Sequence, residues 1–197
     1  MILPDGYTDI PNGKIAAIVT HLEMTARPAP LPDPPGAWTL RKIDHPGVDW
    51  FRSLYLRVGA EYMWYGRIRM PDAELAAKIQ SPLVDEYALV NEDREEGLLE
   101  LDFREPDNCE IGMFGVTSNL FGSGAGRWLM NRAQELAWSR GVKRVWLHTC
   151  THDHPKALAF YQRSGFRPFR RQIEVEDDPR LTGVAPRHVA PHVPVIE

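Results

Sequence analysis

Phe121-Gly-Ser-Gly-Ala-Gly126 stands between two stretches of different character. An extended apolar run from Glu110 to Thr117 precedes it, and a run with helical spacing from Arg127 to Arg140 follows it. A glycine loop between a strand and a helix suits an anion, because glycines let backbone N–H groups approach a phosphate and the helix N-terminus adds partial positive charge. The sequence therefore predicts a phosphate-binding turn at this point of the chain.

The segments on either side of this loop follow two different patterns. Upstream, extended runs are joined by short turns, and in the run 97–103 Leu99 and Leu101 share one face while Glu100 and Asp102 share the other. Such runs predict an antiparallel meander, whereas the alternating runs downstream predict strand–helix–strand–helix–strand. The fold class is therefore α+β, with strands expected at 14–24, 38–43, 84–90, 97–103, 110–117, 144–149 and 169–175, and helices at 48–58, from 71, at 127–140 and at 155–164.

Composition and charge argue against some kinds of binding partner, above all nucleic acids and membranes. The 197 residues are 43% hydrophobic and 25% charged, as in globular domains. A formal net charge of −4 and the lack of a Lys/Arg-rich stripe argue against nucleic acid. The longest aliphatic run, Ile15 to Val19, is too short to span a membrane, and the N-terminus lacks the features of a signal peptide. Two cysteines, Cys109 and Cys150, favour free thiols, so we expect a cytoplasmic location and no membrane partner.

Two motifs resemble those of the GNAT superfamily, whose members are acyl-CoA-dependent N-acyltransferases. Gly124-Ala-Gly126 is similar to the end of that superfamily's (Gln/Arg)-x-x-Gly-x-(Gly/Ala) loop. The stretch from His154 to Phe166 resembles its second motif, Asn-x-x-Ala-x-x-x-Tyr-x-x-x-Gly-Phe. The resemblance extends from about Val84 to Val175 and departs at Phe121, where Gln or Arg is usual, and at His154, where Asn is usual.

The resemblance implies a GNAT-like mixed sheet of about six to seven strands flanked by helices. We expect a single N-acyltransferase domain over 1–197, with a proline-rich connector at 27–36 and an irregular C-terminal tail at 177–197. Acetyl-CoA is the implied co-substrate, with its pyrophosphate on the loop amides and an oxyanion donor on the preceding strand near Phe114. The implied cofactor-binding residues are Phe114, Val116, Phe121, Gly122, Ser123, Gly124, Ala125, Gly126, Arg127 and His154.

Two residues are candidates for proton transfer. Glu110 begins the strand before the loop, at the distance at which a catalytic Glu stands in the histone-acetylating branch of the superfamily. Strict alternation would place it on one face with Gly112, Phe114 and Val116, so it is the candidate base. The alternatives are a solvated carboxylate at the strand end, or a histidine as the base. Tyr161 occupies the position of the superfamily's general-acid tyrosine, and the alternative is a helix aromatic that packs on its neighbours.

Tyr62, Trp64 and Tyr65 cluster between the two early helices, a region that borders the acceptor site in GNAT proteins. An aromatic wall there could bind a cationic or apolar amine, so these residues are the candidate substrate-binding set. The alternative is ordinary core packing with Trp50 and Phe51.

Other chemistries fit the sequence less well. The cluster of His148, His152, Asp153 and His154 matches neither a known zinc-finger spacing nor the H-E-x-x-H pattern, so we expect no metal. Asp153 or His154 is better explained as the N-cap of a helix with Pro155 at its first position. The glycine loop lacks the Gly-x-Gly-x-x-Gly spacing of a dinucleotide site. Cys150 is interpreted as a small buried residue, not a nucleophile.

The sequence thus predicts an N-acetyltransferase that transfers an acetyl group from acetyl-CoA to a primary amine by direct attack in a ternary complex. The acceptor is a small-molecule or a peptide amine, and a homodimer is possible. One alternative is a non-catalytic acyl-CoA-binding or protein-interaction module on the same fold. A second alternative is a metal-dependent hydrolase that uses the histidines.

Overall fold

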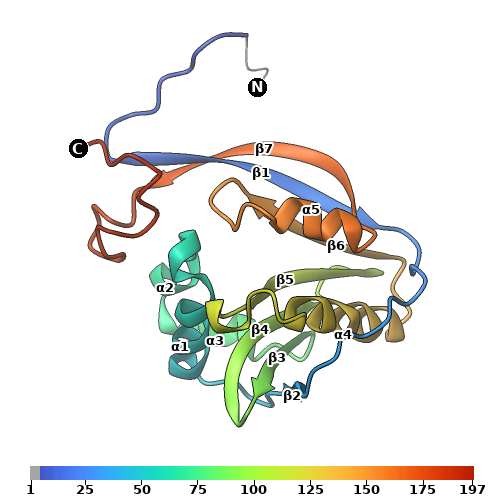
Figure 1. Cartoon of the computed structure of the whole chain (residues 1–197). Coiled ribbons are helices and arrows are strands. Elements are labelled where there is room, and N and C mark those ends of the chain that lie inside the picture. The colour runs from blue at the N-terminus through green and yellow to red at the C-terminus, as the bar shows by residue number, and fades with distance from the viewer. Residues whose placement is uncertain (1–4) are drawn as a thin grey trace.

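The structure is a computed structural model that describes residues 5–197, and it is built around one mixed β-sheet (Figure 1). The seven strands lie in the order β2-β3-β4-β5-β6-β1-β7. Their bounds are β1 Lys14–Met24, β2 Thr39–Lys42, β3 Val84–Asn91, β4 Arg94–Asp102, β5 Asn108–Val116, β6 Arg144–Cys150 and β7 Arg167–Asp177. The helices are α1 Val48–Gly59, α2 Gly66–Arg69, α3 Asp72–Ile79, α4 Ala125–Ser139 and α5 Ala157–Arg163, with short 3₁₀ turns at Ala60–Tyr62 and Ser118–Leu120.

Every pair of neighbouring strands is antiparallel except β5 and β6, which α4 connects. These two strands pair only over Asn108–Glu110 and Arg144–Trp146, and then diverge (Figure 1). The later part of β5 therefore has one edge free of strand partners. The predicted α+β class, with a meander followed by β-α-β-α-β, is confirmed.

Helices cover both faces of the sheet and define two main apolar clusters. α4 and α5 contribute Leu129, Met130 and Tyr161 to the larger cluster, where they meet Leu99 of β4 and Leu147 of β6. On the other face, α1 and α3 pack on β3 and β4, through Phe51, Leu54, Leu75, Ile79, Ala88 and Leu98. In residues 5–197, no helix has both the length and the apolar character that crossing a bilayer requires.

A bulge in β5 corrects the predicted alternation. Across from β4, Glu100 pairs with Met113 and Leu101 pairs with Ile111, so Gly112 is the extra residue. An inserted residue reverses which face the following side chains occupy. Ile111, Phe114 and Val116 all pack on the α4 side, and the prediction that Glu110 shares a face with Phe114 and Val116 is wrong. A Cβ on residue 112 would overlap the Glu100 carboxylate as it stands, so a larger residue at the bulge would require that buried side chain to shift.

The face of β4 that carries Glu100 and Asp102 is buried beneath the early helices. Glu100 is 0% exposed and accepts a hydrogen bond from Arg67 Nη2 at 2.8 Å, and Lys78 Nζ lies 3.5 Å from Asp102 Oδ2. Glu86 of β3 lies beside Glu100, and burial together with that neighbouring carboxylate raises the pKa of Glu86. Glu86 is therefore favoured in its protonated form, since two adjacent buried carboxylates repel each other.

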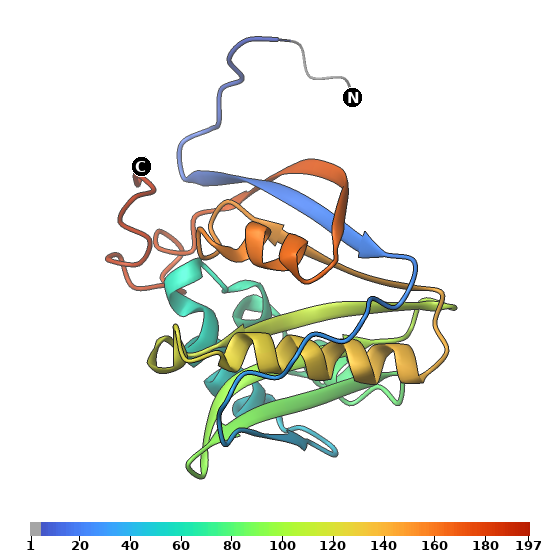
Figure 2. The ribbon, with the colours of Figure 1, turned by 45° about the vertical axis from the view of Figure 1, so that its right-hand side comes forward.

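Two irregular segments pack against the sheet and its helices. Between β1 and β2 the proline-rich segment has no helix or strand and crosses α4 (Figure 2). Asn131 of α4 holds it by donating to the Leu31 carbonyl at 3.0 Å and to Asp33 Oδ1 at 2.7 Å. After β7, Arg180 donates to Asp178 Oδ2 at 2.7 Å and to the Val193 carbonyl at 2.8 Å, which organises the tail.

Candidate functional site

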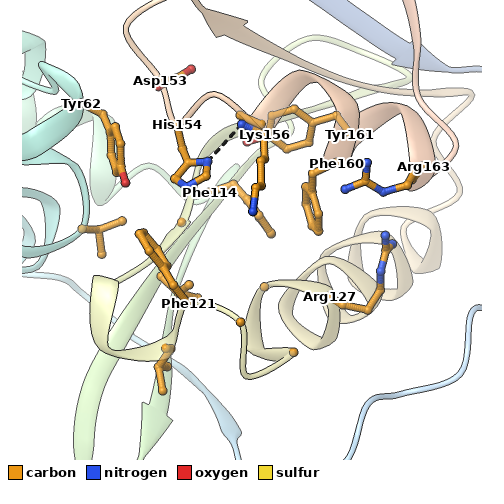
Figure 3. Close-up of a pocket in the computed structure, with 18 of the residues that line it drawn as sticks. Tyr62, Phe114, Phe121, Arg127, Asp153, His154, Lys156, Phe160, Tyr161 and Arg163 are labelled. Carbon is orange, nitrogen blue, oxygen red and sulfur yellow. Dashed lines mark hydrogen bonds between the residues drawn. The ribbon is translucent and has the colours of Figure 1, made fainter. Parts of the chain in front are cut away.

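A cavity of about 450 Å³ lies between the free edge of β5, the glycine loop and α5 (Figure 3). Eight of the ten predicted cofactor-binding residues line it: Phe114, Val116, Phe121, Gly122, Gly124, Gly126, Arg127 and His154. The other two do not. Ala125 is fully buried, and Ser123 donates its hydroxyl to the Leu120 carbonyl at 2.7 Å.

The glycine loop presents a set of unbonded N–H groups to this cavity. Gly122 and Gly124 have φ of 77° and 99°, a region that glycine adopts without strain. The Ser123 and Ala125 N–H groups are bonded inside the loop, to the Leu120 carbonyl and to Ser123 Oγ. Within residues 5–197, the N–H groups of Gly122, Gly124, Gly126 and Arg127 have no protein acceptor. The loop and the start of α4 can thus donate to an anion.

Basic side chains extend the same site. Arg127, Lys156 and Arg163 line the cavity, and Figure 3 shows Lys156 reaching from the start of α5 toward the glycine loop. Arg127 stands 5.0 Å from the centre of the Phe160 ring and donates to Ser164 Oγ at 2.9 Å, which fixes its position. Sequence reasoning missed Lys156 and Arg163. Their spacing of seven residues, about two helical turns, was the available signal.

A second cavity of about 220 Å³ adjoins the first on the side of α2 and β7. The two cavities share five lining residues: Tyr62, Trp64, Phe114, Asp153 and Tyr161. Only the second is lined by Tyr65, His148, Cys150, His152, Glu174 and Glu176. The two cavities are therefore neighbours on either side of these shared residues.

Tyr161, the candidate acid, stands at this junction of the two cavities. Its side chain is 8% exposed, lines both cavities and has no hydrogen-bond partner among residues 5–197. Burial raises the pKa of the Tyr161 hydroxyl above its ordinary value, so it stays protonated near neutral pH. A buried phenol with a free O–H can donate a proton to a group placed beside it.

Glu110 lines neither of these cavities. It lines a shallow hollow with Asp102, Arg104 and Trp146, and its Oε1 lies 3.6 Å from His148 Nδ1. His148 does line the second cavity, and the Glu110 carboxylate raises the pKa of its imidazole. The structure thus places His148 between Glu110, the predicted base, and the second cavity.

Asp153 is a junction residue that sequence reasoning misassigned to helix capping. α5 begins at Ala157 after Lys156, so neither Asp153 nor His154 is its N-cap. Asp153 instead accepts from Trp64 Nε1 at 2.9 Å, from Thr149 Oγ1 at 2.6 Å and from the Cys150 N–H at 2.9 Å. These bonds tie the end of β6 to the segment between α1 and α2. No sequence signal marks such a contact, because Trp64 and Asp153 are distant in the chain.

The three aromatic candidates all line a cavity of the site. Tyr62 and Trp64 line both cavities, and Tyr65 lines the second. Trp64 also packs on Tyr55, with ring centres 5.6 Å apart, so the alternative of core packing holds for part of its surface. His154 packs between Phe121 and Tyr62, with ring centres 5.4 Å and 5.8 Å away.

The remaining candidates concern metal and thiol chemistry. In the part of the chain that the structure describes, no three His, Cys, Asp or Glu side chains are grouped so that they could hold a metal ion. Burial raises the pKa of the Cys150 thiol to about 11, so near neutral pH it is a thiol and not a thiolate.

Comparisons with known proteins agree with this geometry. Residues 70–166 match the sequence model of the acetyltransferase (GNAT) family. A Bacillus subtilis (strain 168) protein named YxbD, itself uncharacterized, is 38% identical over 85 residues, which are 43% of this chain and 51% of that protein. This chain therefore matches about half the length of that relative.

Two solved structures show the likeness of fold. A GCN5-related N-acetyltransferase from Sphaerobacter thermophilus has a TM-score of 0.60 at 19% identity, over 82% of this chain and 51% of that one. A Bacillus subtilis acetyltransferase in complex with CoA has a TM-score of 0.51 at 20% identity, over 66% of this chain and 77% of that one.

Proposed function

Because the chain belongs to the GNAT superfamily of acetyltransferases, we propose that it is an N-acetyltransferase that uses acetyl-CoA and acetylates a primary amine. The observation that carries this proposal is the pair of cavities that meet at Tyr161 and Phe114. One cavity has the donors that a diphosphate needs, and the other has room for a second substrate.

The first cavity is proposed to bind acetyl-CoA. The N–H groups of Gly122, Gly124, Gly126 and Arg127 donate to the pyrophosphate, and the charges of Arg127, Lys156 and Arg163 favour an anion. The pantetheine arm follows the unpaired edge of β5 toward Tyr161. A strand edge offers backbone N–H groups to the thioester carbonyl, so a main-chain donor near Phe114 stabilises the oxyanion.

The acceptor is proposed to enter through the second cavity and to attack the thioester directly. The new N–C bond forms as the C–S bond breaks, so the amine must lose one proton and the sulfur must gain one. His148 receives the amine proton, directly or through a water, from within the second cavity. Glu110 positions His148, because a proton on Nδ1 directed at Glu110 leaves Nε2 free to accept.

Tyr161 is proposed to protonate the departing thiolate. It lies at the wall that the two cavities share, and its hydroxyl has no hydrogen-bond partner among residues 5–197, so its O–H is free to face the sulfur. The phenolate is reprotonated from solvent after the products leave. Direct attack needs no covalent enzyme intermediate, which agrees with the Cys150 thiol remaining protonated.

The proposal is tested by thiol release from acetyl-CoA in the presence of a panel of primary amines. We expect amine-dependent release of CoA and a product heavier than the amine by one acetyl group. Tyr161→Phe should lower the turnover rate, while Arg187→Ala, an exposed residue outside both cavities, should not. Binding of acetyl-CoA without turnover of any amine would contradict the proposal.

A further inference from the structure

The second cavity differs from the first in the sign of its charge. Three carboxylates line it, those of Asp153, Glu174 and Glu176, and no Lys or Arg among residues 5–197 does so. The first cavity is lined by three cationic side chains, and Asp153 is its one acidic lining residue among residues 5–197. The first cavity would attract an anionic co-substrate, and the second cavity would attract a cationic acceptor.

The acidic groups lie away from the point of reaction. Glu174 and Glu176 line the second cavity only, whereas Asp153 at the junction is already engaged by Trp64 and Thr149. Glu176 pairs with Arg69, but Glu174 forms no ion pair among residues 5–197. The attacking amine must be neutral when it reaches the thioester, so Glu174 has no part in that step and is available to a positive group elsewhere on the acceptor.

Buried polar side chains at the same end lack partners. Tyr65 is 3% exposed and His152 is 8% exposed, both line only the second cavity, and neither side chain has a hydrogen-bond partner among residues 5–197. Their polar atoms are not among the buried side-chain atoms that lack a partner, so the Tyr65 hydroxyl and the His152 ring are accessible and can bond to a molecule in the second cavity. Burial lowers the pKa of His152, so near neutral pH its ring is uncharged and can accept a hydrogen bond from a cation.

Resting on the proposed function, we propose that the acceptor is a small aliphatic diamine. One nitrogen is acetylated beside Tyr161, and the second, as an ammonium, is bound by Glu174, His152 and Tyr65. The aromatic rings of Tyr62 and Trp64 enclose the chain between the two nitrogens, and a cavity of about 220 Å³ limits that chain to a short one. An ammonium has three N–H donors, which match one carboxylate and two neutral acceptors.

The test compares three acceptors of one length: butane-1,4-diamine, butan-1-amine and 4-aminobutanoate. We expect kcat/KM for the diamine to exceed that for the monoamine by about tenfold, the worth of one charge-assisted hydrogen bond, with the amino acid poorest. Glu174→Gln should bring the ratio of diamine to monoamine close to one. Glu135→Gln, a control on α4 whose side chain is 56% exposed and lines neither cavity, should keep the ratio.

A binding measurement separates this inference from the catalytic proposal. Butane-1,4-diamine is titrated calorimetrically into the full chain saturated with CoA, with Tyr65→Phe as a second variant. Tighter binding of the diamine than of butan-1-amine, weakened by Glu174→Gln and by Tyr65→Phe, supports the inference even if no amine is acetylated. Equal affinity for the two amines, or a monoamine acetylated as well as the diamine, overturns it while leaving the N-acetyltransferase proposal intact.

Discussion

Two glycines of the loop, Gly124 and Gly126, should respond in opposite ways to the same substitution. Gly124 has φ of 99°, and a Cβ added there would lie 2.8 Å from Pro34 Cβ of the proline-rich segment. Gly126 lies in the first turn of α4 without a positive φ, and a Cβ there would meet nothing within 4 Å. The local geometry therefore separates a residue that must be glycine from one that need not be.

The expected magnitudes follow from that geometry. An alanine forced to keep the φ of Gly124 costs about 1–3 kcal/mol, and relief of the contact with Pro34 adds to this. A loss of about 2 kcal/mol lowers the Tm of a domain of this size by about 4–8 °C. Gly126→Ala instead gains about 0.5–1 kcal/mol, because alanine loses less backbone entropy in a helix. Its Tm should rise by roughly 2 °C.

The two variants should also differ in binding. If Gly124→Ala relieves its strain by turning the loop, one N–H donor to the diphosphate is lost, and affinity for CoA falls about tenfold. Gly126→Ala keeps its N–H and should bind CoA much as the unsubstituted protein does. Thermal unfolding and calorimetric titration with CoA measure both effects. Equal losses of stability in the two variants, or no loss in Gly124→Ala, would refute the reasoning from φ and from the Pro34 contact.

Four further predictions follow from the site and the core. Tyr161→Phe should lower kcat about 100-fold with little change in CoA affinity, because it removes only the proton donor; an unchanged kcat in steady-state assays would exclude that role. Since the pKa of His148 is raised above 6.5, kcat/KM should rise with pH through a midpoint above that value. Glu110→Gln should move this midpoint to lower pH, because the carboxylate that raises the pKa is removed. A pH profile unaffected by Glu110→Gln would contradict the interaction between Glu110 and His148. Arg163→Ala should raise KM for acetyl-CoA, more at low salt than at high salt, with kcat retained; a KM independent of salt would argue against an ionic contact. The raised pKa of Glu86 favours its protonated form, so the stability linked to this group is present at acid pH and is lost as pH rises. In urea unfolding, Glu86→Gln should therefore be more stable than the unsubstituted protein by about 1 kcal/mol at pH 8. At pH 5 the difference in stability between the two proteins should be much smaller.

Local patterns carried most of the fold prediction. The strand at 14–24 and the turn from glycine loop to α4 follow from spacing alone, because the residues that form each element are adjacent in sequence. The bulge at Gly112 could not be seen in this way, since it depends on the Glu100 carboxylate on a neighbouring strand. One inserted residue was enough to place Glu110 and Phe114 on opposite faces of the sheet. His148, which lines the second cavity, then becomes the better candidate for the base.

Contacts between residues that are distant in the sequence determine the lining of the second cavity. Glu174 and Glu176 belong to a strand that appears unremarkable in sequence, yet β7 lies beside β1 and its carboxylates reach the second cavity. The same holds for Asp153, whose partner Trp64 lies in a different segment. Most of the lining of the first cavity was predictable, because one loop and the helices beside it contribute much of it. The lining of the second cavity was not, because it is assembled from β5, β6, β7 and the segment between α1 and α2.

A crystal structure of the protein with bound CoA tests the central claim most directly. We expect diphosphate oxygens within about 2.7–3.2 Å of the nitrogens of Gly124 and Gly126, with the thiol between β5 and Tyr161. CoA bound on another surface, or a loop whose N–H groups face away from the diphosphate, would contradict it.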